Sequence, residues 1–192
     1  MPPPLANFRG GGFVLSLGRR PAQKVPRGEA TPKMNGLFPA LLAFLVIGFL
    51  PAVAGAMFRP GDWYRQLDKP CWHPPNWLFG PVWMALYATI GLSGWLLWRK
   101  AGFSDTLPAF SIYAAQMALN AIWSPIFFGL RRPGLALLEI GVLWVSIAGT
   151  VAAFLTVDIW AALVLLPYLA WVTFAAVLNH AIWRRNRHRI FA

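Results

Sequence analysis

The sequence is dominated by five long apolar segments that follow one another with short breaks. They lie near residues 37–57, 78–98, 107–129, 134–155 and 158–183. Each is close to or above the roughly 20 residues that a helix needs to cross about 30 Å of hydrocarbon. Because lipid offers no partner for open backbone groups, such segments are expected to be helices. We predict an all-α membrane protein: a bundle of five transmembrane helices with one long loop, 58–77, between the first two.

The composition agrees with a membrane bundle and argues against a soluble domain or a nucleic-acid-binding protein. Hydrophobic residues make up 58% of the 192 residues and charged residues 12%, about half the charge of a soluble domain. The net charge of +11 is concentrated at the two ends of the chain. Since no aromatic residues alternate with these arginines, membrane flanks explain them better than an RNA-binding tail, and we expect no nucleic-acid partner.

Three regions follow from this charge distribution. Residues 1–33 carry six basic residues and one acid, and they have no apolar periodicity. We interpret them as a disordered basic extension; a transit peptide and a natural start at Met34 are the alternatives. Residues 34–186 form the predicted membrane domain, and 187–192 a basic C-terminal tail.

The distribution of lysine and arginine predicts the orientation in the membrane. Five spans place the chain ends on opposite faces. Nine basic residues fall on the C-terminal face, including the loop 58–77, and five fall on the other face near the spans. Because positive residues stay inside, we predict that the C-terminus and the loop are cytosolic.

The stretch "KPCWHPPNWLFGPVWMALY", residues 69–87, is an unusual entry to an apolar helix. Its prolines prevent helix before Asn76, which is then a candidate N-cap. Trp72 and Trp77 suit the headgroup level, where amphipathic rings are stable. Cys71 and His73 alone are a weak metal pair, so we predict no metal site.

Aromatic and polar residues recur at helical spacing in three of the apolar segments. Amide and phenol groups are unfavourable on a surface that faces lipid, so these stripes are expected to face the bundle interior. Together they predict a pocket for a large, flat, mostly apolar ligand, with the loop 58–77 over its opening. The stripes are Trp83, Tyr87, Ile90 and Gly94; Gln116, Asn120, Trp123 and Phe127; and Tyr168, Trp171, Ala175, Leu178 and Ile182.

Three motifs resemble the TspO/MBR family of tryptophan-rich sensory and translocator proteins. They are "WYRQLDKPCWHPPNWLFGPVWMALY", "YAAQMALNAIWSPIFFG" and "LPYLAWVTFAAVLN", and the resemblance covers residues 36 to 186. It implies five transmembrane helices, a homodimer, and a bacterial cell envelope membrane or the mitochondrial outer membrane. It also implies binding of porphyrin or haem as a ligand, with no obligatory cofactor.

The resemblance further implies a set of ligand-binding residues and one departure. The ligand-binding residues are Trp63, Tyr64, Trp83, Asn120, Trp123, Trp171, Ala175 and Leu178. Sterol-binding members carry tyrosine where His180 stands in "LNHAIWRR", and the proposed cholesterol pattern needs that tyrosine. This departure weakens the expectation of sterol binding and leaves that of porphyrin binding unchanged.

Several single residues have two interpretations. Glu139 is an acid inside a span, which marks a functional candidate; alternatively it reaches the interface or pairs with Arg131 or Arg132. His180 precedes arginines near a helix end, which favours an interfacial position over axial ligation of haem. Prolines inside spans are expected to kink their helices, namely Pro51, Pro125 and Pro167.

The sequence contains no constellation of catalytic residues. It has no serine–histidine–acid set, no glycine-rich phosphate loop and no cysteine pair. We therefore predict a non-enzymatic membrane sensor or regulator that binds a tetrapyrrole. One alternative is a transporter of porphyrin, sterol or lipid. Another, implied by the resemblance, is a light-dependent porphyrin-degrading enzyme that uses Trp83 and Trp171.

Overall fold

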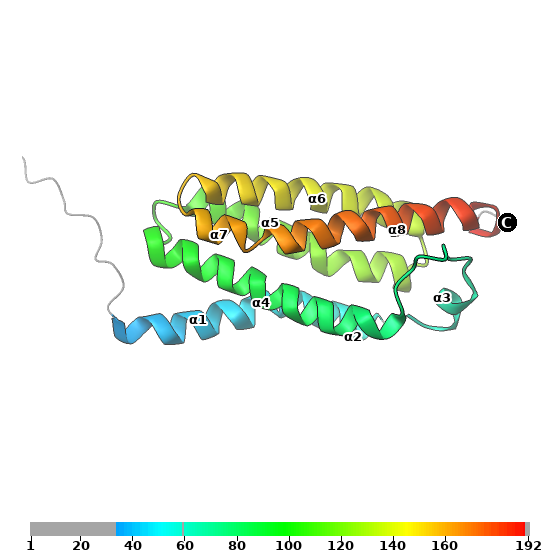
Figure 1. Cartoon of the computed structure of the whole chain (residues 1–192), viewed down its shortest axis with the longest axis horizontal. Coiled ribbons are helices and arrows are strands. Elements are labelled where there is room, and N and C mark those ends of the chain that lie inside the picture. The colour runs from blue at the N-terminus through cyan, green and yellow to red at the C-terminus, as the bar shows by residue number, and fades with distance from the viewer. Residues whose placement is uncertain (1–33, 59, 191–192) are drawn as a thin grey trace, which may run out of the picture. The chain divides into compact units, whose positions relative to one another are not determined.

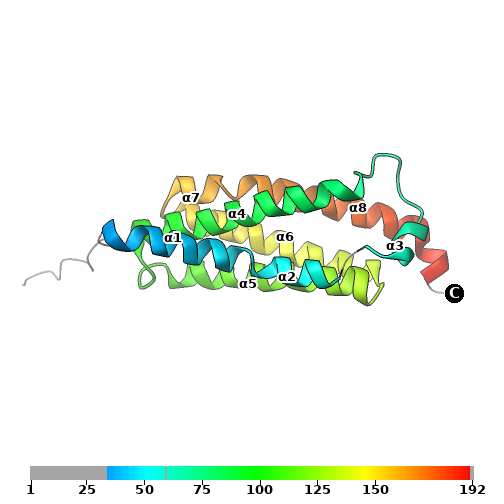
Figure 2. The same cartoon turned by 90° about the horizontal axis from the view of Figure 1, so that it is seen from below.

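The computed structural model describes residues 34–58 and 60–190, and these residues form helices and connections with no strand. The predicted basic extension, residues 1–33, lies outside the described residues. The helices are α1 (Met34–Gly48), α2 (Leu50–Met57), α3 (Asp62–Gln66), α4 (Asn76–Ala101), α5 (Leu107–Ser124), the π-helix η1 (Pro125–Gly129), α6 (Pro133–Leu155), α7 (Ile159–Leu163) and α8 (Leu166–Ile190). Figure 1 and Figure 2 show their arrangement in two perpendicular views.

Four stretches of the described chain are long and apolar enough to cross a membrane. They are Gly36–Met57, Asn76–Ala101, Pro133–Leu155 and Ile159–His188, and they coincide with the first, second, fourth and fifth predicted segments. The third, 107–129, coincides with α5 and η1 but is not among the four. Its polar residues, including Gln116 and Asn120, dilute its apolar character. The all-helical class is thus confirmed, with four candidate spans.

Three of the five predicted segments are divided into separate helices near a proline, where the sequence predicted a kink. Pro51 and Pro167 lie in the first turns of α2 and α8, and Pro125 begins η1. Proline has no N–H to donate and clashes with the preceding turn, so the regular α-helix is interrupted at each position. At Pro125 the backbone widens to an i→i+5 bond, in which the Leu130 N–H donates to the Pro125 carbonyl at 2.8 Å.

The helices pack into a closed ring. Helices α1 and α4 are in contact, α4 contacts α7 and α8, both of these contact α6, α6 contacts α5, and α5 contacts α2. Figures 1 and 2 show the long helices running side by side. Polar side chains are buried between them, for example Ser93, whose hydroxyl donates to the Ala161 carbonyl at 2.6 Å. The ring therefore has an interior that side chains from every long helix can reach.

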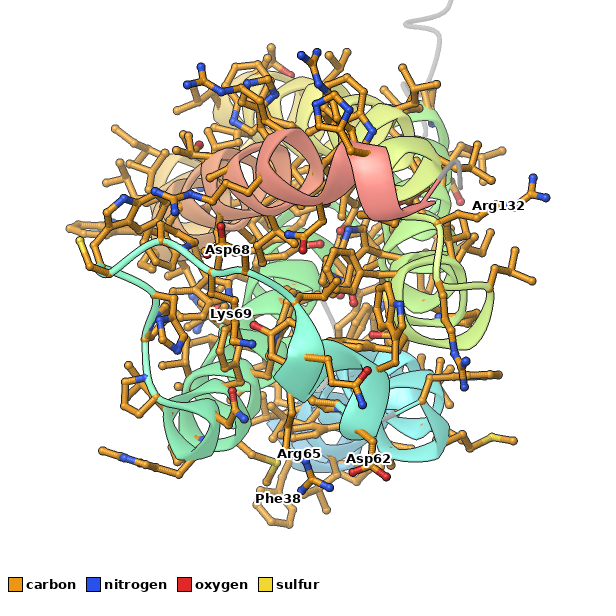
Figure 3. All side chains as sticks on the ribbon, turned by 90° about the vertical axis from the view of Figure 1, so that its right-hand side faces the viewer. Phe38, Asp62, Arg65, Asp68, Lys69 and Arg132 are labelled. Atoms are coloured by element: carbon orange, nitrogen blue, oxygen red, sulfur yellow. The ribbon has the colours of Figure 1, made fainter. Side chains whose placement is uncertain are left out.

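The segment between α2 and α4 lies against the C-terminal end of α8. The Asp68 N–H donates to Asn186 Oδ1, and Asn186 Nδ2 donates to the Asp68 carbonyl, both at 2.9 Å. Figure 3 looks onto this end and shows Asp68 beside α8, with Asp62 and Arg65 close together on α3. The sequence predicted a loop here and missed α3. The predicted cap is also wrong, because Pro75 holds the N-cap position and Asn76 is the first residue of α4.

Candidate ligand site

A cavity of about 500 Å³ lies inside the ring, at the end where the α2–α4 segment meets α8. Helices α2, α3, α4, α5, α6 and α8 and the π-helix η1 all contribute to its wall. The volume falls within the range of sites for drug-sized ligands. No lysine, arginine, histidine, aspartate or glutamate of the described residues lines it. The described residues therefore give the cavity a neutral, largely apolar wall.

Three tryptophans from three helices give the cavity its aromatic walls. Trp83 of α4 stacks on Tyr87, with ring centroids 5.3 Å apart. Trp123 of α5 stacks on Phe127 at 5.0 Å. Trp171 of α8 packs edge-on against Phe79 of α4 at 5.9 Å. Such contacts hold the rings in place, so the walls present fixed aromatic surfaces on which a flat ligand can stack.

A hydrogen-bonded network anchors the polar side of the same cavity. Asn120 Nδ2 donates to the Tyr168 hydroxyl at 2.9 Å, and the Tyr87 hydroxyl donates to Asn120 Oδ1 at 3.4 Å. Tyr168 is fully buried and Asn120 nearly so. The network joins α4, α5 and α8, which positions Trp83 and Trp123 relative to each other. It explains why polar groups occur at this depth in an apolar bundle.

Other polar groups of the cavity have no partner among the described residues. Neither Nδ2 nor Oδ1 of Asn179 is hydrogen-bonded, although its side chain is only 2% exposed. The indole N–H groups of Trp123 and Trp171 are buried and unpaired as well. Leaving such a group unsatisfied costs about 1–3 kcal/mol. All three residues line the cavity.

The α2–α4 segment closes one side of the cavity and is held in a fixed conformation. Tyr64 of α3 lines the cavity and packs edge-on against Phe127 at 6.1 Å. Lys69 Nζ donates to the carbonyls of Tyr64, Leu67 and Arg65 at 2.7, 3.0 and 3.2 Å. Burial raises the pKa of the Tyr64 phenol. Burial also lowers the pKa of Lys69, against the opposing effect of Asp68.

The structure brings together seven of the eight residues implied by the family resemblance. Those that line the cavity are Tyr64, Trp83, Asn120, Trp123, Trp171, Ala175 and Leu178. Trp63 does not line it; its ring packs against Phe127 at 5.9 Å from outside the cavity wall. Sequence reasoning missed Asn179, although it directly follows Leu178. It also missed the small residues of α2 that line the cavity, such as Ala52 and Gly55.

Glu139 and His180 lie outside this cavity. Both carboxylate oxygens of Glu139 are buried and have no hydrogen-bond partner among the described residues. The predicted pairing with Arg131 or Arg132 is therefore wrong: those arginines are exposed in the turn before α6, and the oxygens do not reach the surface. His180 is exposed on α8, and it lines a second hollow of about 350 Å³ with Trp72, Arg184 and others.

Comparison with known proteins identifies the family. The TspO/MBR family profile matches residues 40–184, which include every described residue that lines the cavity. The chain belongs to the TspO/MBR family. It is thus a multi-pass integral membrane protein, in agreement with its four candidate spans.

Relatives of this TspO/MBR protein come from bacteria, archaea and mammals. The chain is 39% identical over 156 residues to the tryptophan-rich sensory protein of Cereibacter sphaeroides, covering 81% of this chain and 97% of the relative. It is 39% identical to the human translocator protein, covering 76% and 89%. It is 38% identical to the tryptophan-rich protein TspO of Archaeoglobus fulgidus, covering 78% and 96%. None of these names denotes an enzyme.

Proposed function

We propose that the protein is a membrane receptor that binds a porphyrin or haem in the cavity and acts as a sensor or regulator. The observation that carries this is the neutral chamber of about 500 Å³ walled by Trp83, Trp123 and Trp171. Aromatic stacking suits the flat, apolar face of a tetrapyrrole. None of the described residues on the wall is an acid, a base or a metal ligand, which supports ligand binding over acid–base chemistry. The polar network at Asn120 fixes the walls before the ligand arrives.

We also propose how the chain crosses the membrane and how it assembles. The less apolar α5, together with η1, forms a fifth crossing, whose buried amides are shielded by the other helices. The C-terminus and the α2–α4 segment lie on the cytosolic side, because the lysines and arginines are more numerous there. The receptor acts as a homodimer in a bacterial cell envelope membrane or the mitochondrial outer membrane, with the lipid bilayer as its other partner.

Ligand titration of the purified full chain tests the proposed function. Protoporphyrin IX should quench tryptophan fluorescence saturably, with one site per chain. Trp171→Ala should weaken binding by about 1–3 kcal/mol, the range for loss of a stacking ring. The matched control is Trp160→Ala, because Trp160 lies on α7, is 67% exposed and does not line the cavity. Equal losses in both variants, or quenching that never saturates, would show partition into detergent and overturn the proposal.

A transporter is the second candidate, and the name of the human relative favours it. It would move porphyrin or a lipid through the same cavity. Vesicles that contain the reconstituted protein distinguish the two: a receptor saturates with bound ligand without net flux, whereas a transporter delivers ligand to the lumen. The third candidate, a light-dependent enzyme that degrades porphyrin, is tested by illuminating the loaded protein and analysing the products. In this candidate Trp83 or Trp171 would pass an electron to the excited ligand.

A further inference from the structure

Of the three asparagines that line the cavity, Asn120 and Asn179 are buried, and the hydrogen bonding of these two differs. Asn120 is satisfied on both sides by the hydroxyls of Tyr87 and Tyr168. Asn179 is equally well buried, at 2% exposure, yet neither its Nδ2 nor its Oδ1 has a partner among the described residues. Buried amides in proteins are normally paired. Asn120 therefore has a structural role, whereas Asn179 carries an unused donor and an unused acceptor on a residue that lines the cavity.

The residues around Asn179 fix its position but form no hydrogen bond with its side-chain amide. Its neighbours Leu178 and Ile182 are buried in an apolar cluster with Tyr64 and Phe127. Trp123 packs against the same cluster and lines the cavity with an unpaired indole N–H. The amide thus sits on a rigid helix among apolar side chains, where a hydrogen bond is stronger than in water.

The chemistry of the amide defines the group that it can recognise. A primary amide places an N–H and a C=O side by side, so its best partner has an adjacent acceptor and donor. A lactam or a cis-amide edge has this pattern and is neutral. A carboxylate can only accept, which leaves Oδ1 unpaired, and no cationic side chain of the described residues lines the cavity to balance its charge. A carboxylic acid has the pattern only when protonated, well below neutral pH.

We propose that Asn179 is a specificity-determining residue that selects ligands with a neutral lactam edge. This inference rests on the part of the proposed function that places a tetrapyrrole in the cavity, and it changes which tetrapyrrole is preferred: the lactam edge belongs to open-chain forms, which should bind more tightly than the closed porphyrin. The ring of a closed porphyrin carries its N–H groups at the centre and presents no such edge. The tryptophan walls provide stacking for either form, and Asn179 distinguishes between them.

The test compares two neutral tetrapyrrole diesters of similar size on the full-length protein. Biliverdin dimethyl ester carries lactam edges, and protoporphyrin IX dimethyl ester carries none. The unmodified protein should bind the biliverdin ester at least tenfold more tightly. Asn179→Leu should weaken binding of the biliverdin ester by tenfold or more and change binding of the porphyrin ester by less than threefold. Asn179→Ala provides the same comparison if the leucine variant does not fold. Val177→Ala, at a residue 55% exposed on the same helix, is the control.

Infrared spectroscopy gives a second measurement that does not depend on affinity. The lactam C=O stretch of the bound biliverdin ester should lie lower in the unmodified protein than in Asn179→Leu, because the carbonyl accepts a hydrogen bond from Nδ2. Equal losses of both esters in the Asn179 variants would make the residue merely structural and overturn the inference. Tight porphyrin-ester binding without biliverdin-ester binding would also overturn it and would leave the proposed function intact. Binding of neither ester would overturn both.

Discussion

Gly48 of α1 and Gly91 of α4 lie in direct backbone contact. A β-carbon at Gly48 would be 2.8 Å from the Gly91 nitrogen, and one at Gly91 would be 2.7 Å from the Phe44 carbonyl oxygen. Real β-carbons do not approach backbone atoms this closely. Small residues allow such approach between membrane helices, where van der Waals packing replaces the hydrophobic driving force. The pair fixes α1 beside α4 and thereby sets the spacing of α2 and α4 around the cavity.

Gly91→Ala should therefore destabilise the protein by about 1–3 kcal/mol, as overpacked cores do. The obstructing atoms are backbone, so the two helices must move apart, and thermal unfolding in detergent should show a lower midpoint. Gly141→Ala is the matched control. A β-carbon at Gly141 meets nothing within 4 Å, so this variant should be neutral or slightly more stable, as alanine favours helix. An unchanged midpoint in Gly91→Ala would contradict the close crossing.

Asn186 holds the α2–α4 segment onto α8. Its amide pairs with both backbone groups of Asp68, and Nδ2 also donates to the Ile182 carbonyl at 2.8 Å. Asn186→Leu should release the segment and increase the dissociation rate of protoporphyrin IX about tenfold. Two lost hydrogen bonds of about 0.5–1.5 kcal/mol each are enough for this change. Stopped-flow dilution of the loaded protein measures the rate.

Arg185→Ala is the control for Asn186. Arg185 approaches the Asp68 carboxylate at 3.5 Å, with both side chains about half exposed. Exposed ion pairs contribute about 0–1 kcal/mol, so the dissociation rate should change by less than about threefold. If both variants dissociate at the rate of the unmodified protein, the α2–α4 segment does not limit ligand exit.

The sequence predicted correctly those features that depend on residues within a single helix. The apolar segments, the breaks at Pro51, Pro125 and Pro167, and the inward stripes all follow from spacing and propensity along one element. It failed where a role depends on contacts between elements. Asn76 seemed a cap because its side chain suits that position, yet Pro75 already has the extended backbone of a cap. Pairing with Arg131 or Arg132 was one interpretation of Glu139, yet both of its carboxylate oxygens are buried and have no partner among the described residues.

The candidate site shows the same division. Trp83, Asn120 and Trp171 could be proposed because aromatic and polar residues are conspicuous in an apolar segment. Asn179 follows Leu178 directly, but only the three-dimensional packing shows that it lines the cavity without a partner. Ala52 and Gly55 resemble any other small residues of a membrane helix. Their contribution to the wall depends on where α2 packs against α5.

Residues 1–33 should be dispensable for folding and ligand binding. They lie outside the family match, which begins at residue 40, and their composition has no apolar periodicity. A chain that starts at Met34 should insert into the membrane and bind protoporphyrin IX with unchanged affinity. Loss of binding would show that the extension belongs to the site. Mass spectrometry of the mature N-terminus distinguishes a retained extension from a cleaved transit peptide and from a start at Met34.

His180 should limit sterol binding. It lies on the exposed side of α8, 6.0 Å from the Trp183 ring, and lines the second hollow with Trp72 and Arg184. Tyrosine at this position would add a flat amphipathic ring with a hydroxyl at its tip, which imidazole cannot supply. His180→Tyr should therefore raise the affinity for cholesterol. Binding of protoporphyrin IX should stay within about threefold, a difference below 1 kcal/mol, because His180 does not line the main cavity.

The same substitution at His188 separates a site effect from a general gain in hydrophobicity. His188 is also exposed on α8, two turns further toward its end, and lines neither the cavity nor the second hollow. His188→Tyr should leave cholesterol binding unchanged. Parallel titrations of cholesterol and protoporphyrin IX on the three proteins decide the question. Tight cholesterol binding by the unmodified protein would contradict the role given to His180. It would also favour a lipid transporter over a tetrapyrrole receptor, since the sterol would then bind without the tyrosine that the family pattern requires.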